Sequence, residues 1–130
     1  MNMTAPPDIV VIEDDPIMRE ALTDWLEAAG YGVRVAAEGN AGLAAVKLAV
    51  PAVVITDIQM PGTSGADIIA ELKRDYREVA IIAISGLFNS GHGLDAEAAL
   101  ALGAARALTK PFKRAELLRA VAELLGRSAP

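Results

Sequence analysis

The sequence predicts an α/β domain in which five parallel strands form a doubly wound sheet with helices on both faces. Short β-branched runs, such as residues 9–12, are apolar without alternation, which is typical of strands buried on both faces. Segments with apolar residues three and four positions apart lie between these runs, as expected for amphipathic helices. Strict alternation of the two kinds of segment favours right-handed crossovers in one parallel sheet.

The first half of the chain contains three of the predicted strands and two of the predicted helices. The expected strands are 9–12, 31–36 and 52–56, and the expected helices are 16–29 and 40–49. Asp15 followed by Pro16 is the pattern of an N-cap and a first helical residue. Gly30 is expected to end this helix, and Asn40 is expected to cap the next one.

The second half repeats the alternation. The expected strands are 79–84 and 106–109, and the expected helices are 64–74, 95–102 and 113–125. Ser64 with Asp67 resembles a capping box, and glycines at 103 and 126 are expected helix ends. The only histidine, His92, falls in a glycine-containing segment, 87–93, which we expect to be an exposed loop.

Composition narrows the possible functions. The 130 residues fit one domain with a core at about 8–126 and flexible tails at 1–7 and 127–130. The net charge of −5 gives no bulk attraction to nucleic acid or to anionic lipid. The chain has no cysteine, and we expect neither a signal peptide nor a membrane span, so we predict a cytoplasmic protein.

Polar side chains follow the predicted strands. Strand 9–12 is followed by three acids, and the other three end residues are an acid, a hydroxyl and an amine: Glu13, Asp14, Asp15; Asp57; Ser85; Lys110. The carboxyl ends of parallel strands meet at one edge of the sheet, where ligands bind. Clustered carboxylates repel one another unless a cation intervenes, and Mg²⁺ prefers oxygen ligands. Carboxylate, metal and lysine together favour aspartyl-phosphate chemistry. Asp15 is already explained as a helix cap.

Four motifs carry a resemblance to a known family. They are IVVIEDDP at 9–16, ITDIQMPG at 55–62, ISG at 84–86 and TKPF at 109–112. In this order and at these separations, they resemble the receiver domain of bacterial two-component response regulators. The resemblance covers nearly the whole chain and implies a flavodoxin-like strand order, 2-1-3-4-5.

The resemblance also implies a role for each site residue. Asp57 would be the phosphoacceptor. Asp14 would bind Mg²⁺ directly, Glu13 would act mainly through water, and the backbone carbonyl of Gln59 would complete the metal site together with Asp57. Ser85 would bond the phosphoryl group. Lys110 would pair with a phosphoryl oxygen, and the Lys110–Pro111 peptide bond would be cis.

The resemblance further implies partners. A histidine kinase or phosphotransfer protein would supply the phosphoryl group, and we hypothesise that it contacts Ile17 and Ala21 on the first helix. No output domain is recognised in the sequence, so we expect a stand-alone receiver that signals to an unknown target protein through surface contacts. Trp25, at helical spacing from Met18 and Leu22, is interpreted as a core residue.

One position departs from the family pattern. Many receivers carry Tyr or Phe three residues before the lysine, where this chain has Ala107. Alanine has no rotamer to switch, so we expect loop 87–93 and the helix after it to carry the response.

Three alternative functions are each opposed by a feature of the sequence. A phosphohydrolase with an aspartyl-phosphate intermediate would need an acid where this chain has Gln59. A nucleotide- or flavin-binding domain would need a glycine-rich loop after the first strand. The last alternative is a pseudo-receiver that acts only as an interaction module.

Overall fold

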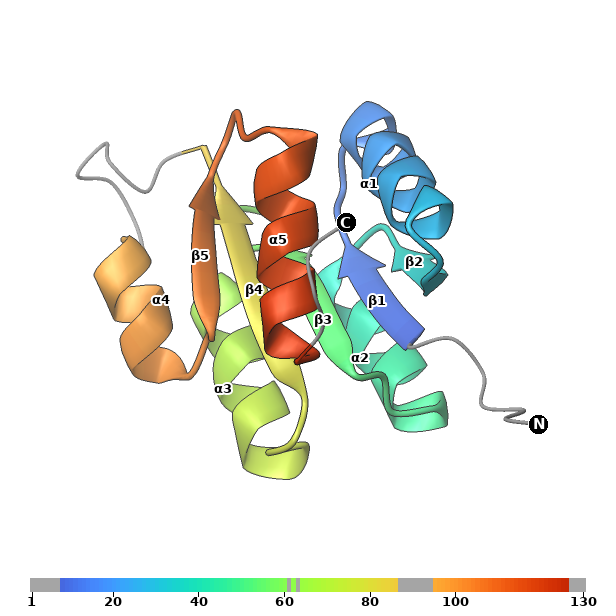
Figure 1. The fold of residues 1–130 in the computed structure, drawn as a ribbon. Coiled ribbons are helices and arrows are strands. Elements are labelled where there is room, and N and C mark those ends of the chain that lie inside the picture. Colours follow the sequence, from blue (N-terminus) through green and yellow to red (C-terminus); the bar gives the residue numbers. More distant parts are fainter. Residues whose placement is uncertain (1–7, 61, 63, 87–94, 127–130) are drawn as a thin grey trace.

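A computed structural model describes residues 8–60, 62, 64–86 and 95–126 (Figure 1). Its strands are β1 (Asp8–Ile12), β2 (Gly32–Ala36), β3 (Val53–Asp57), β4 (Ala80–Ser85) and β5 (Arg106–Thr109). Its helices are α1 (Pro16–Ala28), α2 (Gly39–Leu48), α3 (Gly65–Asp75), α4 (Ala96–Leu102) and α5 (Arg114–Leu124). Every predicted element is present, with bounds that differ by at most one residue at each end.

The five strands form one parallel sheet in the order β2-β1-β3-β4-β5, which confirms the predicted order. The order reverses between β1 and β3, and Ile12 lies opposite Thr56 there. The next residue of each strand, Glu13 and Asp57, therefore emerges at the same point of the sheet edge. This reversal is where open α/β sheets bind ligands.

The sheet is buried on both faces because its inner strands are apolar along most of their length. Residues 9–12 of β1 and 53–55 of β3 have no exposed surface. Successive side chains alternate between the faces: Val11 and Ile55 pack with α1 and α5, while Val10 and Val54 pack with α2, α3 and α4. Figure 1 shows the two helix layers on either side of the sheet.

Trp25 lies in the core layer between α1 and α5, as predicted. Its ring meets the Phe112 ring edge-on, with 6.5 Å between the centroids. Leu22 and Leu26 on the same face of α1 have no exposed surface. The stripe of apolar residues on α1 is therefore a packing face.

The start of α1 is as predicted, and the start of α2 is not. Asp15 accepts a hydrogen bond from the Ile17 amide at 3.0 Å, and Pro16 begins α1. The prediction of an Asn40 cap is wrong: α2 begins at Gly39, after Glu38, without a side-chain cap. Asn40 thus lies inside the first turn, past the N-cap position. Gly42 lets α2 pack closely on β1, because an added Cβ would lie 2.3 Å from Ile12 Cδ1.

Some predictions fall on residues that the structure does not describe. Loop 87–93, His92 and the two tails lie outside the described residues. None of the described helices has the length and apolarity needed to cross a membrane.

Candidate functional site

Three predicted site residues meet at the carboxyl edge of the sheet. One carboxylate oxygen from each of Glu13, Asp14 and Asp57 lies within 4.8 Å of the others. Glu13 is fully buried and Asp57 is 4% exposed, whereas Asp14 is exposed. The cluster thus has a buried floor and one side open to solvent.

Lys110 joins two of these carboxylates. Its ammonium donates to Glu13 Oε1 at 2.9 Å and to Asp57 Oδ2 at 2.7 Å. The backbone of Lys110 is fixed as well, because its amide donates to the Ser85 carbonyl at 2.8 Å. The Lys110–Pro111 peptide bond is cis, as expected. The lysine therefore links the ends of β1 and β3 across the sheet edge.

Gln59 holds the other oxygen of Asp57. Its backbone amide donates to Asp57 Oδ1 at 2.7 Å. Its side-chain carbonyl accepts a hydrogen bond from the Ser85 hydroxyl at 2.6 Å. Only the backbone carbonyl of Gln59 was expected to take part in the site, so this side-chain contact is an addition to the predicted site. Nothing in the local sequence would have shown it, since 26 residues separate the partners.

Burial and charge change the acidity of two groups in the cluster. Burial raises the pKa of Glu13 to about 7, and hydrogen bonds from Lys110 and from the Asp15 amide offset only part of this rise. Burial alone would lower the pKa of Lys110, but its hydrogen bonds to Asp57 and Glu13 outweigh burial and raise it. The lysine is therefore charged at neutral pH, while the buried glutamate is held near its titration point.

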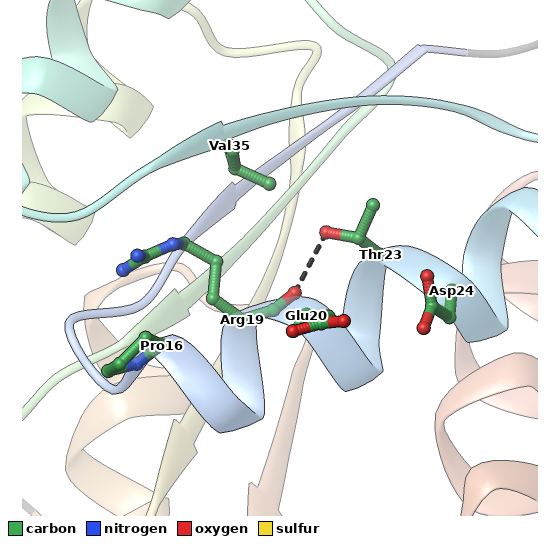
Figure 2. A pocket seen from close by; sticks show the side chains of 6 residues that line it. All are labelled: Pro16, Arg19, Glu20, Thr23, Asp24 and Val35. Carbon is green, nitrogen blue, oxygen red and sulfur yellow. Dashed lines mark hydrogen bonds between the residues drawn. The ribbon is translucent and has the colours of Figure 1, made fainter.

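The segment between β1 and α1 is fixed by an arginine that the sequence analysis did not single out. Arg19 Nη1 donates to the carbonyl oxygen of Glu13 at 2.9 Å and lies 3.5 Å from that of Asp14. Figure 2 shows Arg19 reaching back from α1 past Pro16, in a groove of about 330 Å³ between α1 and β2. Because Arg19 binds backbone carbonyls, it orients the acidic residues without neutralising their carboxylates.

A glycine fixes the segment between β3 and α3. Gly65 is buried at the start of α3, and an added Cβ would lie 2.3 Å from Ile58 Cβ and 2.6 Å from Ile58 Cα. No side chain fits at this distance unless the backbone moves. The helix thus presses directly on the residue between Asp57 and Gln59.

The donors present fit a hard divalent cation. Mg²⁺ takes carboxylate and carbonyl oxygens and keeps several waters, and this cluster offers three carboxylates beside an open side. A cation at the cluster would also stabilise the ionised form of Glu13, which burial disfavours. The residues present therefore suit the metal that the sequence predicted.

Two further predicted positions lie around the site. Ile17, in the first turn of α1, is 80% exposed, while Ala21 one turn later is half-buried. Ala107 on β5 lies opposite Ala83 of β4. It packs against the cluster formed with α2, α3 and α4. Ile17 is accessible to a partner, and the side chain at 107 is a small packing residue.

Known proteins match this chain over most of its length. The family model described as "response regulator receiver domain" matches residues 9–122. The transcriptional regulatory protein FixJ of Azorhizobium caulinodans is 38% identical over 119 residues, which are 92% of this chain and 55% of that protein. The DNA-binding response regulator MtrA of Mycolicibacterium smegmatis is 32% identical over 120 residues, or 92% of this chain and 51% of that protein. This chain thus spans about half the length of these curated relatives.

Solved structures share the fold over almost all of the chain. A putative response regulator from Chloroflexus aurantiacus has a TM-score of 0.84 at 28% identity and covers 94% of this chain and 99% of its own. The chemotaxis protein CheY4 of Vibrio cholerae has a TM-score of 0.82 at 25% identity, with 92% and 99% covered. With the family match over residues 9–122, the chain belongs to the response regulator receiver domain family.

Proposed function

We propose that Asp57 accepts a phosphoryl group in a Mg²⁺-dependent reaction and that this modification switches the domain's contacts with another protein. The observation that carries the proposal is the pairing of Lys110 with Asp57 at 2.7 Å within a cluster of three carboxylates. The nearly buried carboxylate of Asp57 lies between the Lys110 ammonium and the cluster that suits Mg²⁺. Such a carboxylate is suited to attack on a phosphorus atom.

The proposed roles divide the cluster. Asp14, Asp57 and the backbone carbonyl of Gln59 hold Mg²⁺ directly, and Glu13 acts mainly through water. When bound, the metal neutralises charge on the transferring phosphoryl group. Lys110 exchanges a carboxylate oxygen for a phosphoryl oxygen, and its raised pKa keeps it charged for this task.

The transfer itself needs no further reactant. An oxygen of Asp57 attacks the phosphorus of a phosphohistidine, the new O–P bond forms as the N–P bond breaks, and the imidazole leaves with the electron pair. Hydrolysis of the acyl phosphate by water later restores the carboxylate. The same oxygen can attack a small acyl phosphate, which gives a simple laboratory donor.

We propose a histidine kinase or a histidine phosphotransfer protein as the physiological donor. Ile17 supports this assignment, since it is 80% exposed two residues from Asp15 at the mouth of the site. An apolar side chain in that position is suited to contact with a docking protein. Ala21 continues the same side of α1 one turn away.

We also propose that residues 8–126 act as one self-contained receiver in the cytoplasm. A solved chain that matches over 99% of its own length supports the first part, and a chain without cysteine suits a reducing compartment. The target protein is reached through surface contacts, and the net charge of −5 argues against direct attraction to DNA.

The test is phosphorylation by labelled acetyl phosphate with and without Mg²⁺. We expect an acid-stable, base-labile adduct on the wild type and none on Asp57→Asn. Asp67→Asn, a matched change at an exposed acid of α3, should keep the adduct. Steady phosphate release from sugar or nucleotide esters would favour a phosphohydrolase. An adduct on Asp57→Asn, or no adduct from any donor, would refute the proposal, and the second result would favour a pseudo-receiver.

A further inference from the structure

The proposed chemistry needs the hydroxyl of Ser85, and the side chain of Gln59 already holds that hydroxyl in a hydrogen bond. Ser85 Oγ donates to Gln59 Oε1 at 2.6 Å. A hydroxyl has only one proton to donate. If Ser85 is to donate to a phosphoryl oxygen on Asp57, this hydrogen bond must break first. Ser85 has no exposed surface, so bulk water cannot take the place of the amide.

We propose that the side-chain amide of Gln59 is a latch that holds Ser85 in the unphosphorylated arrangement and so opposes phosphoryl binding at Asp57. The proposal rests on the function proposed above. It makes Gln59 a positioning residue, because its side chain acts through Ser85 and not on phosphorus.

The backbone makes the latch specific to the state of Asp57. The backbone amide nitrogen of Gln59 donates to Asp57 Oδ1 at 2.7 Å, so residue 59 is anchored to the carboxylate that would be phosphorylated. The Lys110 amide, in turn, donates to the Ser85 carbonyl at 2.8 Å, and the Lys110 ammonium returns to Asp57 Oδ2 at 2.7 Å. Asp57, Gln59, Ser85 and Lys110 thus form a closed ring of hydrogen bonds. A phosphoryl group at Asp57 must open that ring at Ser85 and at Lys110.

The latch also allows the switch to work without an aromatic side chain at position 107. Ala107 has no side-chain rotamer to report a movement of Ser85. When Ser85 leaves Gln59, the half-buried side chain of Gln59 loses its partner and must find another. The change is therefore delivered to the segment between β3 and α3, where Gly65 lies in direct contact with Ile58.

A double-mutant cycle on beryllofluoride affinity tests the latch. The four proteins are the wild type, Gln59→Met, Ser85→Ala and the double variant, titrated with beryllofluoride by calorimetry at saturating Mg²⁺. Methionine matches the length of glutamine and cannot accept the Ser85 proton well. One hydrogen bond fewer to break should make Gln59→Met bind about three- to tenfold tighter than the wild type. In the Ser85→Ala background the same change should leave the dissociation constant within about twofold.

The coupling between the two positions decides the outcome. A gain of equal size in both backgrounds would show that the Gln59 side chain acts on access or on the metal, and weaker binding by Gln59→Met would show that the amide assists. Either result overturns the latch. Gln59→Asn is a second variant, too short to reach Ser85, and should show the same coupling if Gln59→Met folds poorly. If the wild type binds beryllofluoride and Asp57→Asn does not, but positions 59 and 85 are not coupled, the latch alone is refuted. If the wild type does not bind beryllofluoride, the proposed function is refuted as well.

Discussion

Replacing Lys110 with methionine removes the ammonium that bridges two buried carboxylates and keeps an unbranched side chain of similar length. In the wild type this ammonium lies 2.9 Å from Glu13 Oε1 and 2.7 Å from Asp57 Oδ2. The two acidic side chains are 0% and 6% exposed, and that of the lysine is 22% exposed. Removing one partner of a buried ion pair costs about 3–5 kcal/mol. The partial exposure of Lys110 favours the lower end, about 3 kcal/mol.

The loss of stability should depend on pH. The pKa of Glu13 is raised to about 7 by burial, and loss of the Lys110 donor raises it further. A folded-state pKa above the unfolded value means that the folded protein binds the extra proton as pH falls. The stability contributed by this proton is therefore fully present below about pH 4.5, the ordinary pKa of a glutamate, and is lost as the pH rises to about 7 in the wild type and to a higher pH in the variant. We expect Lys110→Met to lose less stability at pH 5.5, where Glu13 is protonated in both proteins and only the pairing with Asp57 is lost, and to be about 3 kcal/mol less stable at pH 8.5, a fall in melting temperature of about 12 °C.

Mg²⁺ should reverse most of this loss. A metal ion at one hundred times its dissociation constant adds about 2.7 kcal/mol to the folded state. Thermal unfolding followed by circular dichroism at both pH values, with and without Mg²⁺, measures the loss of stability, its dependence on pH and its reversal by the metal. Lys113→Met, three residues away and exposed, loses the same charge and should behave as wild type. If Lys110→Met melts with wild-type stability at pH 8.5 without metal, the bridging role of Lys110 is wrong.

Three further changes test the metal site, the packing of α3 and the docking surface. Arg19→Met removes hydrogen bonds to the carbonyls behind the acidic residues and should weaken Mg²⁺ binding about three- to tenfold by calorimetry, whereas an unchanged affinity would show that the loop holds its own shape. Gly65→Ala must push α3 about 1.1 Å away from Ile58 to reach an ordinary contact of 3.4 Å and should cost about 1–2 kcal/mol in denaturant unfolding. Gly86→Ala, with its nearest contact at 3.9 Å, should be neutral, and equal stability of the two variants would contradict the packing argument. Ile17→Glu should slow transfer from the cognate donor about tenfold or more while leaving acetyl phosphate labelling intact, and an unchanged rate from both donors would remove α1 from the docking surface.

The sequence was sufficient for the parts of the fold that depend on local pattern. Runs such as 9–12 are apolar on both faces, and this pattern alone predicted a strand with helices on both sides. Asp15 with Pro16 is a local signal for a helix start, and it was correct. The Asn40 cap was wrong because α2 begins one residue earlier, at Gly39, and the close packing of Gly42 on Ile12, thirty residues away in the chain, leaves no local signal.

The same division applies to the site. Strand ends bring Glu13, Asp14 and Asp57 together in any sheet of this order, so their proximity could be expected before the structure was known. The contact between Gln59 and Ser85 could not, because it depends on a side-chain rotamer and on the path of the segment after Asp57. Arg19 was overlooked for a similar reason: it binds backbone carbonyls, and those leave no mark on the pattern of side chains.

The edge-on contact between Trp25 and Phe112 gives the protein an intrinsic optical probe. Trp25 is the only tryptophan in the chain, and Phe112 lies two residues after the lysine that must change partners. A movement of that segment alters the surroundings of a single indole. Emission recorded in a stopped-flow instrument should therefore follow the switching step in real time on the unlabelled protein.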